Sequence, residues 1–275
     1  MFLRYFVFAL AALSTLASAA DPVVSPEVAK AAARVKEVIG HKGSCADSPE
    51  NTVAGIRRAI EAGANAAEVD VRTTKDGFLV CLHDDTLDRT TEAKGKVSGF
   101  TLAEVKKLDA GSKFDKKFAN ERVPTLQEVL TTAKGKIGIM LDLKEPGEEY
   151  VKKIVAGVRE FGEPKRIVLG IRSVEHGKQF AELLPEARQI GLVPTQNDIE
   201  PFAKAGVKVI RLWPKWLTDE TLVPRVRKAG CELHIGTTMG TKAEVVPLLT
   251  HSPESLSSDD PAQLRKTLAE LTTPK

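Results

Sequence analysis

Cysteine and aromatic residues are scarce in this sequence of 275 residues, which holds three cysteines and 5% aromatics. Three cysteines are too few for the disulfide scaffold of a small secreted domain. The 40 Lys and Arg residues nearly balance the 37 Asp and Glu residues, so charge alone indicates no nucleic-acid partner. With 42% hydrophobic residues, the chain has the composition of a soluble globular protein and not of a disordered one.

A long apolar run occurs at the N-terminus. Arg4 precedes an apolar stretch over residues 5–17, and small residues up to Ala20 precede Asp21. This three-part pattern is typical of a secretory signal peptide, and the run is shorter than the roughly 20 apolar residues of a membrane span. We expect residues 1–20 to be removed on export, to a periplasm or to the medium, without a remaining membrane anchor. An uncleaved anchor is the alternative.

Export would place the three cysteines, Cys45, Cys81 and Cys231, in an oxidising compartment. An odd number allows at most one disulfide within the chain. Each cysteine lies beside an apolar run, so we expect buried, inert thiols. If a disulfide forms, we expect it to join Cys45 to Cys81.

Short β-branched runs alternate with longer amphipathic stretches from residue 35 onward, and no linker interrupts them. This alternation predicts one domain over residues 35–275, after a lead-in over residues 21–34. The expected strands are 35–40, 67–72, 78–83, 137–144, 166–171, 189–193, 207–213, 232–236 and 255–258. The expected helices are 51–62, 125–133, 148–161, 175–184, 199–205, 219–229, 243–249 and 261–271.

Repeated strand-then-helix units predict a parallel sheet, because parallel strands need crossover connections. An Asp-Gly turn joins residues 67–72 to residues 78–83, so we expect a hairpin that counts as one unit. Eight units then remain, which favours an α/β fold of the (β/α)8 or TIM barrel type over a doubly wound open sheet. Residues 84–122 are too many for an ordinary loop and predict a small insertion after the second strand unit, beside the barrel mouth.

Two histidines lie at the expected carboxyl ends of strands, where such barrels carry their chemistry. His41 follows the strand that ends at Gly40, and His83 ends its own strand. A single histidine on an apolar segment is more often structural. Two at equivalent strand ends predict a general base and a general acid for one displacement.

Three carboxylates are expected inside the barrel. Glu68 and Asp70 alternate on one strand, so both side chains point to the same side. The same alternation turns Asp142 inward on another strand, with Lys144 nearer its end. Oxygen ligands favour Ca²⁺ or Mg²⁺ over zinc, since no cysteine is expected nearby. An ion-pair network with a lysine or with Arg72 is the alternative.

Several motifs along the chain resemble those of the glycerophosphodiester phosphodiesterase family, over residues 39–268. They are Gly40-His41-Lys42-Gly43, Ser48-Pro49-Glu50-Asn51-Thr52, Glu68-Val69-Asp70-Val71, Lys75-Asp76-Gly77, residues 82–91, residues 123–128 and Ser257-Ser258-Asp259-Asp260-Pro261. The resemblance implies a (β/α)8 barrel that uses one divalent cation, Ca²⁺ or Mg²⁺. It also implies a small-molecule substrate, a glycerophosphodiester, which is hydrolysed to an alcohol and glycerol 3-phosphate.

The resemblance further implies roles for matching residues. His41 and His83 carry the proton transfers. Which of them is the acid and which the base stays open, and our own hypothesis favours His41 as the base and His83 as the acid. Glu68 and Asp70 bind the metal, while a second pair, Glu50 and Asn51, supports the site.

Two positions depart from the family pattern. Asp142 stands where the family usually has a metal-binding glutamate, so its carboxylate has a shorter reach. Lys42 stands where the family has a phosphate-binding arginine, and a lysine offers a point charge instead of a planar fork. We therefore expect weaker phosphate binding, or binding adapted to another substrate, with Lys144 as a further cation.

The last third of the chain resembles the family least. Trp213 and Trp216 are expected either to wall the substrate pocket or simply to pack. We expect a core or rim position for His234, although it could face the mouth. His176 and His251 are expected on the surface.

Two other functions fit the same residues. One is a related lyase that stops at a cyclic phosphate, as the similar phosphatidylinositol phospholipases and sphingomyelinase D-like toxins do. The other is an exported phosphodiester-binding protein without activity, which only Lys42 suggests. The head group, the acyl content of the substrate and the oligomeric state stay open.

Overall fold

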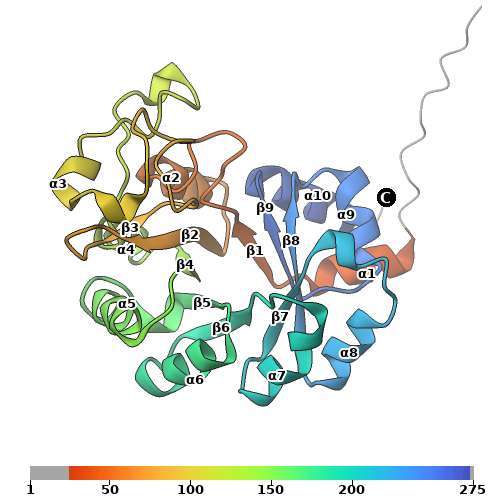
Figure 1. Ribbon diagram of the computed structural model, residues 1–275. Coiled ribbons are helices and arrows are strands. Elements are labelled where there is room, and N and C mark those ends of the chain that lie inside the picture. The colour runs from red at the N-terminus through yellow and green to blue at the C-terminus, as the bar shows by residue number, and fades with distance from the viewer. Residues whose placement is uncertain (1–24, 273–275) are drawn as a thin grey trace, which may run out of the picture.

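Eight parallel strands close into a ring in the computed structural model, which describes residues 25–272 (Figure 1). The ring runs through β1 (Glu37–Gly40), β2 (Ala66–Thr73), β4 (Gly138–Leu143), β5 (Ile167–Ile171), β6 (Arg188–Gly191), β7 (Val209–Leu212), β8 (Glu232–Thr238) and β9 (Ser255–Ser258). β1 pairs in parallel with both β2 and β9, and these two pairings close the barrel. The expected (β/α)8 barrel is confirmed, and the open sheet is excluded.

Helices surround the ring, as expected for crossover connections (Figure 1). They are α1 (Pro26–Arg34), α2 (Val53–Glu61), α4 (Leu126–Ala133), α5 (Glu148–Phe161), α6 (Val174–Leu183), α7 (Ile199–Lys204), α8 (Leu222–Lys228), α9 (Lys242–Leu249) and α10 (Pro261–Thr272). Single 3-10 turns precede β5 and α7 and follow β7, at η3 (Pro164–Arg166), η4 (Gln196–Asp198) and η5 (Pro214–Trp216). Polar residues begin several helices. Thr125, for example, caps α4 in a reciprocal box with Glu128.

Helix α1 was not expected, because its residues were assigned to the lead-in. Ser25 accepts a hydrogen bond from the backbone N–H of Val28, and Pro26 occupies the first helical position. Both features favour a helix start. α1 packs against α9 and α10, and it buries Ala31 and Ala32 in the main core.

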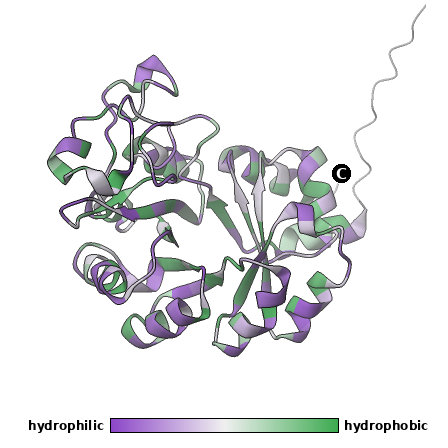
Figure 2. Ribbon diagram, viewed as in Figure 1, coloured by the Kyte–Doolittle hydropathy of each residue, from purple (hydrophilic) through white to green (hydrophobic). Residues whose placement is uncertain are grey.

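The side chains of β4 alternate between two environments, as the sequence predicts. Ile139, Leu141 and Leu143 face the helices and belong to the main apolar core. Met140 instead lies inside the ring, in a small apolar cluster contributed by several strands. In Figure 2, several strands of the ring are mainly hydrophobic, while the surrounding helices combine hydrophilic and hydrophobic residues. The inside of the barrel is therefore filled at Met140, and the inward residue that follows on β4, Asp142, lies next to that apolar filling.

A polar segment stands beside the barrel where residues 84–122 were expected to form an insertion (Figure 1). β3 (Leu79–Cys81) pairs antiparallel with β2 outside the ring, and the chain then forms η1 (Val97–Gly99), α3 (Leu102–Val105) and η2 (Lys116–Phe118). This segment has an apolar cluster separate from the barrel core, made of Val80, Leu82, Leu87, Val97, Val105, Ala110 and Val123. It is thus a small packed unit and not a loose loop.

Cys45, Cys81 and Cys231 are free thiols, as expected, and the Cys45–Cys81 disulfide considered as an option is not present among the described residues. Cys81 lies in the apolar layer under the helices, whereas the Cys45 thiol lies 3.1 Å from the Asp259 carboxylate. Cys81 and Cys231 are buried, as expected, while Cys45 is half-buried.

The expected surface position of His176 is wrong. Its side chain is 6% exposed and packs edge-on against Phe180, on the inner face of α6. His251 is half-buried.

The expected signal peptide, residues 1–20, lies outside the described residues. Within the described part of the chain, each helix is too short or too polar to cross a membrane.

Candidate active site

His41 lies directly after β1, in a turn that only small residues permit. A methyl group on Gly40 would overlap the Gly43 carbonyl, and Gly43 itself has a φ of +96°. The backbone N–H of His41 donates to the Ser258 carbonyl of β9 at 2.8 Å. The backbone is therefore fixed on both sides of the histidine.

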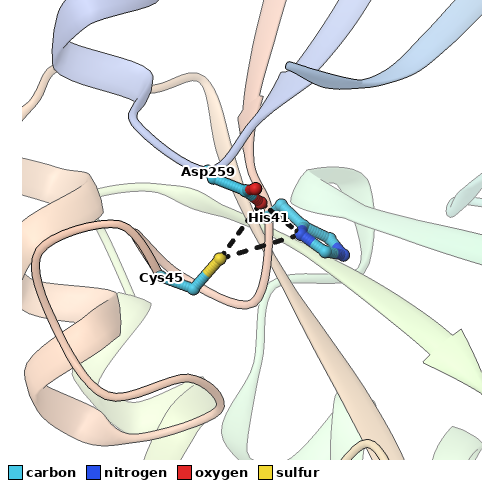
Figure 3. A group of neighbouring side chains, drawn as sticks. All are labelled: His41, Cys45 and Asp259. Atoms are coloured by element: carbon cyan, nitrogen blue, oxygen red, sulfur yellow. Dashed lines mark hydrogen bonds and ion pairs between the residues drawn. The ribbon is translucent and has the colours of Figure 1, made fainter. Parts of the chain in front are cut away.

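The His41 ring is oriented by Asp259, the residue after β9. Nδ1 of His41 lies 2.6 Å from Oδ1 of Asp259 (Figure 3). A carboxylate only accepts hydrogen bonds, so Nδ1 carries the proton and Nε2 is the free acceptor. Burial raises the pKa of Asp259, but hydrogen bonds from His41 and Cys45 lower it more, and the net shift is downward. Burial lowers the pKa of His41, while Glu68 and Asp259 raise it above its ordinary value.

His83 has a similar arrangement but a more open position. It lies two residues beyond β3, and its side chain is 40% exposed. Nδ1 lies 2.8 Å from Oδ1 of Asp84, and the Arg72 guanidinium donates to the His83 backbone carbonyl at 2.7 and 3.0 Å. Arg89 donates to Asp84 at 2.6 Å, and the pKa of Asp84 falls to about 2 because Arg89 and His83 outweigh the opposing effect of burial.

Glu68, Asp70 and Asp142 each bring one oxygen within 4.8 Å of the others. All three are at most 2% exposed. Asp70 and Asp142 are direct neighbours in the β2–β4 register. Asn51 fixes Asp70, because its amide donates to Oδ2 at 2.7 Å and its carbonyl accepts from the Asp70 backbone N–H at 2.9 Å.

Two cations neutralise part of this cluster. The Lys144 ammonium lies 2.8 Å from Asp70 and 2.6 Å from Asp142. Arg172, directly after β5, grips both oxygens of Asp142 with hydrogen bonds of 2.7 and 2.6 Å. Burial raises the pKa of Asp142, but Arg172 and Lys144 lower it well below its ordinary value. The ion-pair network considered as an alternative is therefore present, through Lys144 and not Arg72.

Glu68 is the least satisfied of the three carboxylates. Its closest cation, Arg211, is 3.8 Å away, and Oε2 is buried without a hydrogen-bond partner. A buried carboxylate oxygen without a partner is costly, and a bound divalent cation would satisfy it. Three carboxylates within reach of one point form the oxygen donor set that Ca²⁺ and Mg²⁺ prefer. These residues therefore fit such an ion.

Lys42 and Glu50 lie on the turn between β1 and α2. The Lys42 ammonium is 3.3 Å from Glu50, and Arg89 holds both oxygens of Glu50 at 2.6 and 2.7 Å. Burial raises the pKa of Glu50, but Arg89 and Lys42 lower it more. Arg89 thus ties the insertion to the β1–α2 turn.

Trp213 is half-buried after β7, and the Arg211 guanidinium lies 4.1 Å from its ring centre. His234, on β8, is fully buried, and its Nδ1 lies 2.8 Å from the Ser255 hydroxyl. Burial and the neighbouring Arg211 lower the pKa of His234 well below its ordinary value. This is the core position expected for His234.

Sequence reasoning missed five charged residues of the site, namely Asp84, Arg89, Arg172, Arg211 and Asp259. Asp84, Arg89 and Asp259 were inside quoted motifs without an assigned role. Arg172 immediately follows the expected strand 166–171, and Arg211 lies at an inward-facing position of the expected strand 207–213. Strand position, the same signal that identified the carboxylates, could therefore have identified both. Cys45 contacts Asp259, the partner of His41, and does not belong to the cluster of Glu68, Asp70 and Asp142.

Known proteins are similar to this chain in sequence and architecture. The sequence profile of the Glycerophosphoryl diester phosphodiesterase family matches residues 41–261. A glycerophosphodiester phosphodiesterase of Caldanaerobacter subterraneus subsp. tengcongensis is 36% identical over 238 residues, which cover 82% of this chain and 95% of that protein.

Two solved structures are also similar. One is a glycerophosphodiester phosphodiesterase from Agrobacterium tumefaciens, with a TM-score of 0.72 and 28% identity, covering 84% of this chain and 99% of that one. The other is an Oleispira antarctica phosphodiesterase in complex with its product sn-glycerol-3-phosphate, with a TM-score of 0.77 and 25% identity, covering 87% of this chain and 99% of that one. From its profile match and its similarity to the Caldanaerobacter protein, this chain belongs to the glycerophosphodiester phosphodiesterase family of phosphoric diester hydrolases.

Proposed function

We propose that the chain hydrolyses glycerophosphodiesters to an alcohol and glycerol 3-phosphate, with His41 as general base and His83 as general acid. One observation carries this proposal. Each histidine is bound through Nδ1 to a carboxylate, at 2.6 Å for Asp259 and 2.8 Å for Asp84, so each leaves Nε2 for a reacting group. Such pairs fix the tautomer and the orientation of a catalytic imidazole.

In the proposed reaction, Nε2 of His41 takes the proton of the attacking hydroxyl. Asp259 accepts the hydrogen bond from Nδ1 and stabilises the imidazolium that results. Protonated His83 donates its Nε2 proton to the oxygen of the leaving alcohol, with Asp84 on its other nitrogen. The more open position of His83 suits a general acid, because the alcohol that it protonates must leave the site.

Glu68, Asp70 and Asp142 would hold one divalent cation, Ca²⁺ or Mg²⁺, in this proposal. When bound, the ion supplies positive charge beside the phosphate. Lys42 adds a second positive charge from the β1–α2 turn, and Asn51 holds Asp70 in place. Lys144 and Arg172 neutralise part of the negative charge of Asp70 and Asp142.

The substrate assignment is supported by the Oleispira antarctica structure with sn-glycerol-3-phosphate. We place the glycerol phosphate over the carboxylate cluster, with Trp213 as an apolar wall. A cavity of about 160 Å³ adjoins Glu50 and Arg89 and is also lined by Pro49, Ala110, Lys113 and Phe114. Its position between the β1–α2 turn and the insertion suits the leaving alcohol.

The test is release of glycerol 3-phosphate from a panel of glycerophosphodiesters, with and without a chelator. We expect activity that the chelator abolishes and that Ca²⁺ or Mg²⁺ restores. His41→Ala and His83→Ala should each lower kcat by about a hundredfold or more. His251→Ala, a half-buried histidine outside the site, is the matched control. A nearly normal rate in both site variants would contradict the assignment.

Phosphorus NMR of the products separates the hydrolase from a related lyase. If the glycerol hydroxyl of the substrate attacks first, a cyclic phosphate forms and is then hydrolysed. A cyclic phosphate that accumulates without further conversion would identify the lyase. Absence of turnover on the whole panel, with metal restored, would instead support a binding protein.

We also propose export with removal of residues 1–20, on the pattern of Arg4, the apolar run and the small residues near Ala20. Mass spectrometry of the protein from its native host measures the mature N-terminus. A mature chain that begins near Asp21 supports the proposal, and an intact Met1 in the folded protein contradicts it.

A further inference from the structure

Three different metal-binding side chains meet beside the carboxylate cluster. His41 Nδ1, Cys45 Sγ and Asp259 Oδ1 lie within 4.8 Å of one another (Figure 3). The separations are 2.6 Å from His41 to Asp259, 3.1 Å from Cys45 to Asp259 and 3.8 Å from Cys45 to His41. The proposed reaction uses the histidine and the aspartate but not the thiol. The Sγ atom of Cys45 is therefore a possible metal ligand that has no role in the proposed reaction.

The donor set is that of a zinc ion, not of Ca²⁺ or Mg²⁺. Thiolate and imidazole ligands suit Zn²⁺, whereas Ca²⁺ and Mg²⁺ take oxygen ligands. In a tetrahedral zinc site, bonds of about 2.3 Å to sulfur and about 2.0 Å to nitrogen and oxygen separate the ligand atoms by about 3.3 to 3.5 Å. The three observed separations differ from this range by less than about 1 Å. Small rotations of the Cys45 and Asp259 side chains would accommodate the ion.

The cluster is also accessible. Cys45 lines the cavity of about 160 Å³ between the β1–α2 turn and the insertion. The thiol is half-buried, unlike the buried Cys81 and Cys231. Cys45 belongs to the lining of this cavity, whereas His41 and Asp259 do not. The fourth zinc position would face the cavity, where water can fill it.

We propose that His41, Cys45 and Asp259 form a binding site for Zn²⁺, separate from the carboxylate cluster, and that zinc bound there inhibits the hydrolase. Binding releases the thiol proton to solvent and moves the imidazole proton from Nδ1 to Nε2. His41 then has no free nitrogen with which to accept a proton. Asp259 is also drawn away from the ring that it orients. The inhibitory effect, though not the binding site, rests on the catalytic role proposed for His41.

Binding is tested directly by adding Cd²⁺, a spectroscopic substitute for zinc, to the full chain. Cadmium bound to a thiolate gives a ligand-to-metal charge-transfer absorption, whereas cadmium bound to carboxylates does not. We expect this absorption in the unmodified protein, with saturation at one ion per chain and displacement by Zn²⁺. It should disappear in Cys45→Ser and persist in Cys231→Ser, whose thiol donates to the Val207 carbonyl inside the fold. Circular dichroism checks that both variants are folded.

Inhibition is measured on the same proteins at a fixed concentration of Mg²⁺ or Ca²⁺, each relative to its own rate without zinc. We expect the zinc concentration for half-inhibition to rise at least about tenfold in Cys45→Ser, since even the outer partners of metal ligands commonly contribute about 10- to 100-fold to affinity. Cys231→Ser should match the unmodified protein. Equal sensitivity of Cys45→Ser and the unmodified protein would overturn the proposed inhibition.

The two proposals fail in different ways. Absence of the charge-transfer absorption, or its persistence in Cys45→Ser, overturns the zinc site whatever the enzyme activity is. Thiolate-bound cadmium at full enzyme activity leaves the binding site supported and contradicts the role of His41. Absence of activity without any zinc contradicts the proposed function, while the absorption measurement still decides the binding site.

Discussion

Asp259 Oδ1 lies 2.6 Å from His41 Nδ1, although 218 residues separate the two in the chain. β1 and β9 are neighbours in the ring, so the residues that follow them meet at the barrel mouth. A carboxylate in this place keeps the proton on Nδ1 and leaves Nε2 free for the proposed proton transfer.

Asp259→Asn should therefore lower kcat by about a hundredfold with little change in KM, because the amide can donate to Nδ1 and reverse the tautomer. Steady-state kinetics on a glycerophosphodiester provide the measurement. Asp260→Asn is the matched control, since Asp260 accepts from the Gln263 backbone N–H at the start of α10 and Asn preserves that cap. An unchanged kcat in Asp259→Asn would refute the orienting role.

Lys144→Met should make the stability of the protein depend on a divalent cation. The Lys144 side chain is 9% exposed and lies between Asp70 and Asp142. Its loss leaves two buried carboxylates with reduced compensation, which costs about 3 to 5 kcal/mol. In the presence of a chelator, Tm should fall by at least about 6 °C.

Saturating Ca²⁺ or Mg²⁺ should then raise Tm more in Lys144→Met than in the unmodified protein, because the competing ammonium is gone. Thermal unfolding with and without the ion measures both effects. Lys152→Met is the control, since Lys152 also pairs with two carboxylates, Glu148 and Glu149, but on the exposed surface. Equal ion-induced shifts in all three proteins would argue against a cation at the carboxylate cluster.

Arg89→Ala should loosen the insertion and weaken substrate binding. Arg89 bridges Asp84 in the insertion to Glu50 on the β1–α2 turn, through three hydrogen bonds of 2.6 to 2.7 Å. The side chain is 48% exposed, so the net interaction is modest, on the order of 1 kcal/mol. We expect KM to rise about threefold to tenfold and hydrogen exchange over residues 84–122 to become faster.

Arg122→Ala is the control for this experiment. Arg122 lies in the same insertion, but it donates only to the nearby backbone carbonyls of Ala119 and Glu121. Its KM should stay close to that of the unmodified enzyme. An equal rise in both variants would mean that the effect comes from the insertion as a whole and not from the Arg89 bridge.

All three thiols should react with a thiol reagent after unfolding, without prior reduction. In the folded protein we expect only Cys45 to be modified, because Cys81 and Cys231 are buried. Modification should be slow, since burial and Asp259 raise the pKa of the Cys45 thiol. Mass spectrometry after alkylation identifies the modified residues. Fewer than three reactive thiols in the unfolded protein would indicate a disulfide and contradict this prediction.

The barrel and its carboxylates could be predicted because both depend on short-range periodicity. Alternation on β4 alone determines that Asp142 faces inward while Leu141 and Leu143 face the helices. Helix α5 and strand β9 have the predicted bounds. A strong amphipathic run defines α5, whereas β9 is the short segment Ser-Leu-Ser-Ser without a β-branched residue. Helix α1 carries a helix-start signal in Ser25 and Pro26, although it lies in the segment assigned to the lead-in.

The partners across the site could not be predicted in the same way. Arg172 binds Asp142 from a neighbouring strand, and Arg211 reaches Glu68 across the barrel, so both depend on strand order and register. The proximity of Cys45 to Asp259 likewise follows only from the closure of β9 on β1. The burial of His176, in contrast, was predictable. Its spacing of four residues from Phe180 sets it on the inner face of α6.

The closing pair of strands also determines when during protein synthesis the site is complete. The ribosome produces His41, Glu68 and Asp142 long before Asp259, and β9 is the last strand of the ring to emerge. A nascent chain that ends before residue 255 lacks both the partner of His41 and the strand that closes the barrel. Truncated translation products should therefore be inert, and hydrolysis begins only once nearly the whole chain has been made.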